Sequence, residues 1–264
     1  MQNEIDWDRV AKYLRTEIAH GRERGNGEKA IERAKRIIAR CGPSTHTRVM
    51  AQRIARACLR GSPAVVVPVC PDYAHDGTRY TFQGPLGTGV SLLAQRHIAF
   101  LEPLVREDLI HVELLYADQE SLDERLCASA GIKADTFVLH VLESVDATMR
   151  YCLDHSLPIQ VTTMTERFPE LGERERTAAI RVIQNETALI QLDTMARRSM
   201  YHTIDRRMSW EEMRQRTART AAQYLALGEL ASSQGWLVAN HSTVNLRWYL
   251  RTEVGVLHNP TDVY

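Results

Sequence analysis

Cys70 is a candidate nucleophile because it follows directly on a short apolar run, Ala64–Val69, that is rich in β-branched residues. A thiol attacks a carbonyl carbon as the thiolate, a form that nearby cations or a helix N-terminus stabilise. Candidate cations or bases nearby in the sequence are His75, Arg79 and His97. The alternative is a small buried hydrophobic residue, the usual role of a free cysteine. The pattern alone favours that alternative.

Carboxylates lie at two further places where they could bind a substrate or move protons. Glu170, Glu173 and Glu175 stand at the start of a predicted helix, and Asp118 ends a second apolar run. The helix dipole stabilises carboxylates at a helix N-terminus, which gives the glutamates a structural explanation. A glutamate that faces a pocket would instead serve as a general acid or base.

Two other segments allow both a functional and a structural interpretation. The glycine-rich segment 84–89 precedes a predicted helix, where backbone amides can bind a phosphate or a carboxylate. Its spacing matches neither nucleotide-binding fingerprint, which favours a plain turn. The segment 241–249 is dense in polar and aromatic residues. It forms either a pocket wall or a capped helix that packs Leu246 and Tyr249 inward.

The composition disfavours several classes of function. The chain has 264 residues with 33 basic and 33 acidic side chains, so its net charge indicates no partner. Its 10 histidines lack metal-binding spacing and its 5 cysteines lack a CxxC pair, so we expect no metal and no disulfide framework. We find no signal peptide and no apolar run of membrane-spanning length, and therefore expect a cytoplasmic protein without a membrane partner. No cofactor is expected.

The basic residues are concentrated near the N-terminus. Residues 22–60 contain eleven lysines and arginines but only three glutamates. Such a basic block predicts contact with a nucleic acid. The alternative is a solvated helical face.

Hydrophobic periodicity predicts alternating helices and strands. Three helices, 5–20, 28–41 and 46–60, precede the strand Ala64–Val69. A long loop over 70–88, a helix over 89–106 and a strand over 111–118 then complete a right-handed βαβ unit. Beyond it we expect helices over 121–131, 135–153, 170–203 and 210–233, strands over 158–163 and 236–239, and an irregular tail after residue 250.

These elements predict an α/β fold: a single Rossmann-like domain with a mostly parallel central sheet, flanking helices and an N-terminal helical extension. We divide it into a basic helical segment packed on the core, 1–62, and a Rossmann-like catalytic domain, 63–264. Ligands of open parallel sheets bind outside the carboxyl ends of the strands. We therefore expect Cys70 and Asp118 to converge at one edge of the sheet.

Three stretches, in order along the chain, resemble the tRNA-dependent cyclodipeptide synthases. Residues 66–73 are similar to the family's strand-end motif Gly-x-Ser-x-x-Asn, with Cys70 at the position of the nucleophilic serine. Residues 161–177 are similar to the strand and helix that carry the family's Tyr-x-x-x-Glu pair. Leu171 stands at the place of that tyrosine and Glu175 at the place of the glutamate.

The third stretch, 224–249, looks like the family's late helix and strand, whose Tyr-His pair lines the aminoacyl pocket. Trp248 and Tyr249 would lie near that pair. The ATP-binding signatures of class I synthetases are absent from the sequence, so adenylation is not expected. Tyr73 replaces the asparagine of the first motif.

The resemblance implies a fold shared with class I tyrosyl- and tryptophanyl-tRNA synthetases. It also implies an aminoacyl transferase that forms a cyclic dipeptide from aminoacyl-tRNA through a covalent aminoacyl-enzyme. The catalytic residues would be Cys70, Glu175, Glu173 and Tyr249. The substrate-binding residues would be Pro71, Asp72, Tyr73, Asp118, Asn245 and Trp248. The phosphates of tRNA would contact Arg33, Lys35, Arg36, Arg40, Arg53 and Arg56.

Two other interpretations remain open. The chain is either a non-synthase Rossmann-like protein that binds a nucleotide or a small acid at the same strand ends, or an RNA-binding module without catalysis. The second of these would use residues 22–60.

Overall fold

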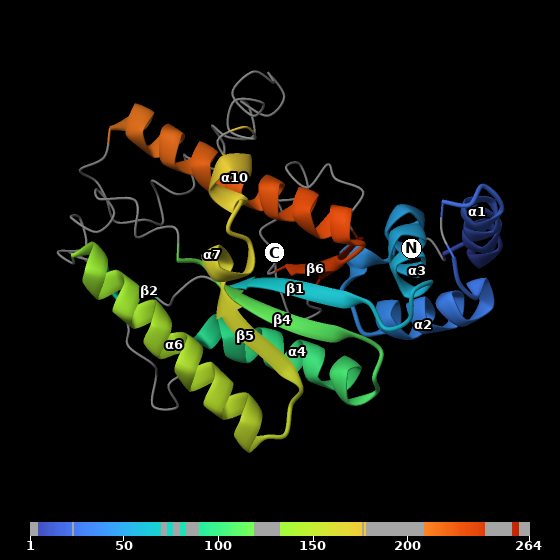
Figure 1. The fold of residues 1–264 in the computed structure, drawn as a ribbon, viewed down its shortest axis with the longest axis horizontal. Coiled ribbons are helices and arrows are strands. Elements are labelled where there is room, and N and C mark those ends of the chain that lie inside the picture. Colours follow the sequence, from blue (N-terminus) through green and yellow to red (C-terminus); the bar gives the residue numbers. More distant parts are fainter. Residues whose placement is uncertain are drawn as a thin grey trace.

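A five-stranded sheet forms the centre of the protein, with helices on both of its faces (Figure 1). Its strands lie in the order β5-β4-β1-β6-β7, and every neighbouring pair is parallel. The strands are β1 (Ala64–Val69), β4 (His111–Tyr116), β5 (Ile159–Thr163), β6 (Leu237–Asn240) and β7 (Gly255–His258). The predicted α/β fold with a Rossmann-like parallel sheet is confirmed. The computed structural model describes residues 5–22, 24–69, 73–75, 80–82, 90–118, 133–175, 177, 209–240 and 255–258.

The central strand β1 is covered on both faces, as its continuous apolar sequence predicts. Five of its six residues are buried. Proline is unusual in a central strand because it has no N–H to donate. Here β6 pairs with Val65 and Val66 only, so Pro68 lies beyond that pairing.

Alternate strand residues face two hydrophobic cores. Val65, Val67 and Val69 lie in a core that also contains buried residues of α4 (Leu92–Arg106) and α6 (Ala134–Asp154). Val66 lies in a second core, on the opposite face of the sheet. That core contains buried residues of α7 (Met164–Arg167) and α10 (Trp210–Gln234).

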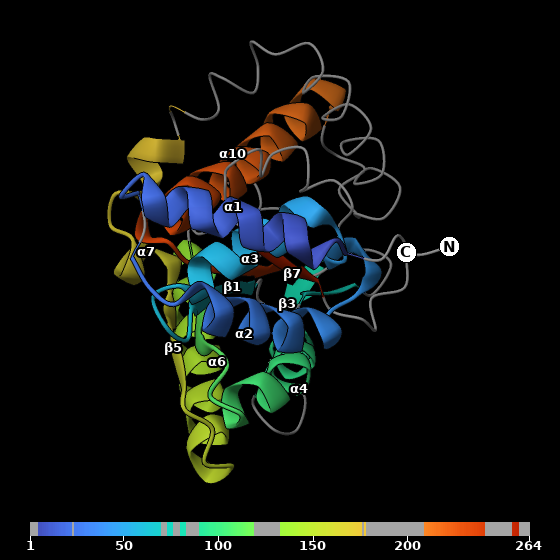
Figure 2. The same cartoon turned by 90° about the vertical axis from the view of Figure 1, so that its right-hand side faces the viewer.

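Three amphipathic helices precede the sheet: α1 (Trp7–Ala19), α2 (Gly27–Ala39) and α3 (Arg48–Cys58). Each begins at a residue whose side chain accepts a hydrogen bond from a first-turn amide: Asp6, Asn26 and Thr47, respectively. Of these, α3 packs against β7, and α1 and α2 pack on α3 (Figure 2). Their buried residues belong to the first core, so they share it with the sheet.

Two elements differ from the sequence prediction. The predicted irregular tail contains β7, all four residues of which are buried. The predicted loop 70–88 contains a short antiparallel hairpin, β2 (Tyr73–His75) and β3 (Tyr80–Phe82).

Distant contacts explain why β7 is a strand although its apolar run is short. Its last residue, His258, donates its amide to the Thr45 hydroxyl oxygen at 3.0 Å. The carbonyl of His258 accepts a hydrogen bond from the amide of Gly42 at 2.7 Å. Both partners belong to the turn that contains the short 3-10 helix η1 (Pro43–Thr45), more than 200 residues earlier in the chain. A local pattern does not contain this information.

Candidate functional site

The carboxyl ends of three neighbouring strands meet at one edge of the sheet, beside α7 (Figure 1). Val69, the last residue of β1, pairs with Tyr116 of β4, and Tyr116 pairs with Thr163 of β5. The amide of Ala117 donates to the carbonyl of Val69 at 2.8 Å, which extends this register past the end of β4. Cys70 follows Val69 in the chain and itself lies outside the described residues.

Asp118 connects this edge to α7. Its carboxylate accepts a hydrogen bond from the Thr165 amide at 3.1 Å and a second, short one from the Thr165 hydroxyl. Thr163 caps α7 by accepting from the Glu166 amide at 3.2 Å. The structure therefore gives Asp118 a positioning role, and its predicted contact with substrate stays a prediction.

A second link holds α7 from the other side. The Nε of Arg167 lies 2.6 Å from a carboxylate oxygen of Glu113 in β4, whose side chain is largely shielded from solvent. The guanidinium of Arg167 also lies over the ring of Trp236, 4.5 Å from its centre, and over that of Phe168 at 5.1 Å. Charged and aromatic contacts thus link the end of α7 to the middle of β4 and to the residue before β6. The sequence analysis did not identify this group, because its members are far apart in the chain.

The predicted glutamates differ in environment. Leu171 is fully buried in the second core, and Glu175, one helical turn later, is 9% exposed. Glu173 is exposed. Residues four apart share a face of a helix, so Glu175 is directed to the same covered side as Leu171. This arrangement favours Glu175 over Glu173 as the shielded carboxylate, and it makes Leu171 a core residue.

Tyr116 is a buried polar residue at this edge that sequence analysis missed. Its hydroxyl lies 2.8 Å from the Thr148 hydroxyl of α6 and 3.4 Å from that of Ser91. Ser91 in turn caps α4, accepting from the Ala94 amide at 3.1 Å. The end of β4 is thereby tied to two helices. The sequence did contain a signal for this role, because Tyr116 is an aromatic residue with a hydroxyl group at the end of an apolar strand.

Three of the five cysteines are in the described part of the chain, and all three are buried. Burial raises the pKa of the Cys41 and Cys58 thiols to about 12 and that of Cys152 to about 11. A thiol that keeps its proton at neutral pH is a poor nucleophile. These three cysteines are therefore structural. The other two, Cys70 and Cys127, lie outside the described residues, and the reactivity predicted for Cys70 stays a prediction.

The basic block divides into separate groups. Arg36 and Arg40, one turn apart on α2, each place a guanidinium nitrogen 2.8 Å from a carboxylate oxygen of Glu107. Lys35 lies 3.9 Å from a carboxylate oxygen of Glu32 and has its ammonium over the ring of Trp7. These side chains lie at the surface, so the ion pairs are screened by solvent.

The rest of the block is partly shielded. Arg33, Arg53 and Arg56 are half-buried, and Arg53 and Arg56 line a cavity. The predicted contact of these basic residues with tRNA stays a prediction.

Several predicted site residues lie outside the described part of the chain. They are Cys70, Pro71, Asp72, Asn245, Trp248 and Tyr249. Tyr73 is described only as a backbone position of β2. Their predicted roles stay predictions.

No family model matches the sequence, and no curated protein matches it either. Within the described residues, no helix has the length and apolar character needed to cross a membrane. Over the same residues, no group of three or more histidine, cysteine, aspartate or glutamate side chains is placed to hold a metal ion.

Proposed function

We propose that this protein transfers aminoacyl groups from aminoacyl-tRNA and forms a cyclic dipeptide, with Cys70 as the nucleophile. The observation that carries the proposal is the topology around β1. The chain continues from β1 to β4 and β5 on one side and reaches β6 and β7 on the other. Ligands of such sheets bind at the carboxyl ends of the strands where the order reverses. The end of β1 is that point, and Cys70 is the next residue.

The chemistry needs no ATP because the ester of aminoacyl-tRNA is already activated. The Cys70 thiolate attacks the ester carbonyl, a sulfur–carbon bond forms, and the bond to the ribose oxygen breaks. The ribose oxygen leaves as a hydroxyl after taking up a proton. The amine of a second aminoacyl-tRNA then attacks the thioester carbonyl, which frees the Cys70 thiol and leaves the dipeptide esterified to the second tRNA. The free amine of the dipeptide attacks that ester carbonyl, so the diketopiperazine closes and the second tRNA leaves with its ribose hydroxyl.

Other residues support this reaction. Amides of the turn after Cys70 would stabilise the oxyanion. Glu175, the shielded carboxylate, would bind the ammonium group or move its proton. Basic side chains of α2, among them Lys35, Arg36 and Arg40, would contact tRNA phosphates, an interaction that weakens steeply with salt.

The direct test is to trap the aminoacyl-enzyme. The purified protein is mixed with tRNA charged with isotope-labelled amino acids, quenched in acid, digested and analysed by mass spectrometry. We expect an added aminoacyl mass on the peptide containing Cys70, removed by hydroxylamine at neutral pH as a thioester is. Cys70→Ala should lose the adduct, whereas Cys152→Ala, which removes a buried thiol, should keep it. A labelled peptide that lacks Cys70, or no adduct at all, would refute the proposal.

A second candidate function rests on the same reversal of strand order after β1. Such a point also suits a nucleotide or a small acid bound without covalent chemistry. Stabilisation of the protein by ATP in a thermal-shift assay, together with an absence of tRNA binding at low salt, would favour this candidate over acyl transfer.

A further inference from the structure

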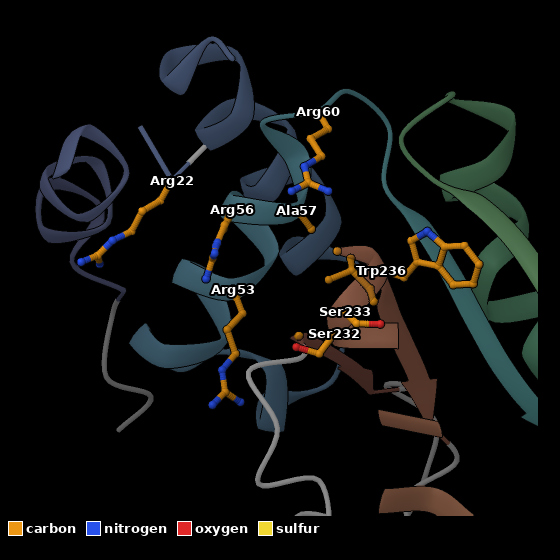
Figure 3. Close-up of a pocket in the computed structure, with 11 residues that line it drawn as sticks. Arg22, Arg53, Arg56, Ala57, Arg60, Ser232, Ser233 and Trp236 are labelled. Carbon is orange, nitrogen blue, oxygen red and sulfur yellow. The ribbon is translucent and has the colours of Figure 1, made fainter. Parts of the chain in front are cut away.

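A half-open cavity of about 200 Å³ lies at the amino ends of the strands, the edge opposite the carboxyl end of β1 (Figure 3). It is lined by α3, the C-terminal end of α10 and the first residues of β6 and β7. Four arginines and two serines supply its polar lining: Arg22, Arg53, Arg56, Arg60, Ser232 and Ser233. Of the proposed catalytic residues, the two that the structure describes, Glu173 and Glu175, do not line it.

The described residues around the cavity carry an excess of positive charge. Its lining contains four arginines, and among the described lining residues there is no carboxylate. One buried carboxylate stands beside it: Glu17, 6% exposed, lies 3.2 Å from Arg22 and 3.8 Å from Arg56. This glutamate holds two of the guanidinium groups in place. Among these described side chains, four are positively charged and one is negatively charged.

The sequence places the arginines at one site through their spacing. Arg53, Arg56 and Arg60 follow one another at intervals of three and four residues, which puts them on one side of α3 and its continuation. Figure 3 shows Ser232 and Ser233 across from them, with the indole of Trp236 turned away from the arginines.

A glycine allows the close approach of one of these arginines. Gly235 ends α10 with a φ of +72°, a left-handed conformation that favours glycine. A Cβ at this position would lie 3.0 Å from the Nη1 of Arg60. The absence of a side chain therefore leaves room for the guanidinium of Arg60 against the turn between α10 and β6.

We propose that this cavity binds the phosphate group of a small phosphorylated molecule, a phosphate monoester or a diphosphate. A guanidinium presents five N–H donors in a planar fork that matches phosphate oxygens, and it can bind a carboxylate and a phosphate together. Arg53, Arg56 and Arg60 make further interactions within the protein, so the phosphate would join an existing polar network. The small volume of this half-open cavity suits a small anionic group more than the broad surface of a folded RNA.

The proposal does not depend on the acyl-transfer function, because the two sites lie at opposite edges of the sheet. It also changes the role expected of Arg53 and Arg56. The sequence assigned both to tRNA, whereas the structure groups them with Arg22 and Arg60 around the cavity.

The test compares two double variants that remove the same charge. Arg53→Gln with Arg60→Gln alters the cavity, while the ion pairs of Glu17 stay intact. Arg9→Gln with Arg150→Gln removes two exposed arginines, one on α1 and one on α6, that lie outside the cavity. Binding of inorganic phosphate, pyrophosphate and a nucleoside diphosphate is measured by calorimetry and thermal shift. Sodium chloride at equal ionic strength is the reference.

We expect pyrophosphate to stabilise the unaltered protein beyond the chloride reference. The cavity variant should bind it about tenfold more weakly or worse, because two charge-assisted contacts are lost. The variant with Arg9 and Arg150 replaced should keep its affinity within about twofold. Tighter binding of the nucleoside diphosphate than of pyrophosphate would identify a nucleotide as the source of the phosphate. Equal affinity would identify the diphosphate group alone.

Three results would overturn the proposal. The first is no stabilisation of the unaltered protein beyond chloride. The second is an equal loss of affinity in both double variants, which would indicate unspecific charge screening. The third is tRNA binding that requires Arg53 and Arg60 while pyrophosphate does not bind. If the glutamine variant fails to fold, Arg53→Lys with Arg60→Lys keeps the charge but loses the fork, and affinity should still fall. The acyl-enzyme assay is scored separately, so each proposal can fail alone.

Discussion

Asp118→Ala should loosen α7 from the end of β4. The resulting loss in the free energy of unfolding follows from two hydrogen bonds. Asp118 accepts from both the amide and the hydroxyl of Thr165, 47 residues later in the chain. A hydrogen bond to a charged group contributes about 1.5–3 kcal/mol when buried. Asp118 is half-buried, so we expect about 1 kcal/mol for each bond, or about 2 kcal/mol in total. The melting temperature should fall by about 5 °C.

A double-mutant cycle isolates the hydroxyl bond. Thr165→Val keeps the shape and the backbone amide of Thr165 but removes its hydroxyl. Urea unfolding of Asp118→Ala, Thr165→Val and the double variant, followed by circular dichroism, should give a coupling energy of about 1 kcal/mol. A coupling below about 0.3 kcal/mol, or an Asp118→Ala variant as stable as the unaltered protein, would refute this reasoning.

Two further predictions concern backbone conformation and pH. Gly25→Ala should lower the free energy of unfolding, measured in urea, by at least about 2 kcal/mol more than Gly21→Ala does. Both glycines have positive φ, so the backbone strain is shared. A Cβ at Gly25 would lie 2.1 Å from the carbonyl oxygen of Leu59, which follows α3, whereas a Cβ at Gly21 would meet no atom within 4 Å. Equal losses would contradict the close approach. Stability should also fall as pH rises above 9, because Cys41 and Cys58 ionise at a pKa of 9.0 when unfolded but keep their protons to a pKa of about 12 when folded. Between pH 8 and 10 the free energy of unfolding should drop by about 3 kcal/mol more than in a variant with both cysteines replaced by alanine. Parallel pH profiles would show that the thiols titrate normally.

Most helices and strands could be predicted from the sequence because local signals determine them. The run Ala64–Val69 is the observed β1, and capping residues such as Asn26 and Thr47 mark the starts of α2 and α3. The strand β7 was missed because its few apolar residues are recognisable only from the distant turn that binds His258.

The candidate site was harder to predict because its contacts are not local. The sequence identified Asp118 and the basic block but not their partners. Thr165 lies 47 residues from Asp118, and Glu107 lies 67 residues from Arg40. The spacing of Arg53, Arg56 and Arg60 was visible, yet the serines that complete their cavity come from the end of α10. These three arginines are grouped with the serines only because α3 lies near the C-terminal end of α10.

The most direct test of the central claim is mass spectrometry of the medium from bacteria that express this protein. Cyclic dipeptides should be present with the unaltered protein and with Cys152→Ala, and they should vanish with Cys70→Ala. Diketopiperazine profiles that are identical for the unaltered protein and Cys70→Ala would contradict acyl transfer at the end of β1.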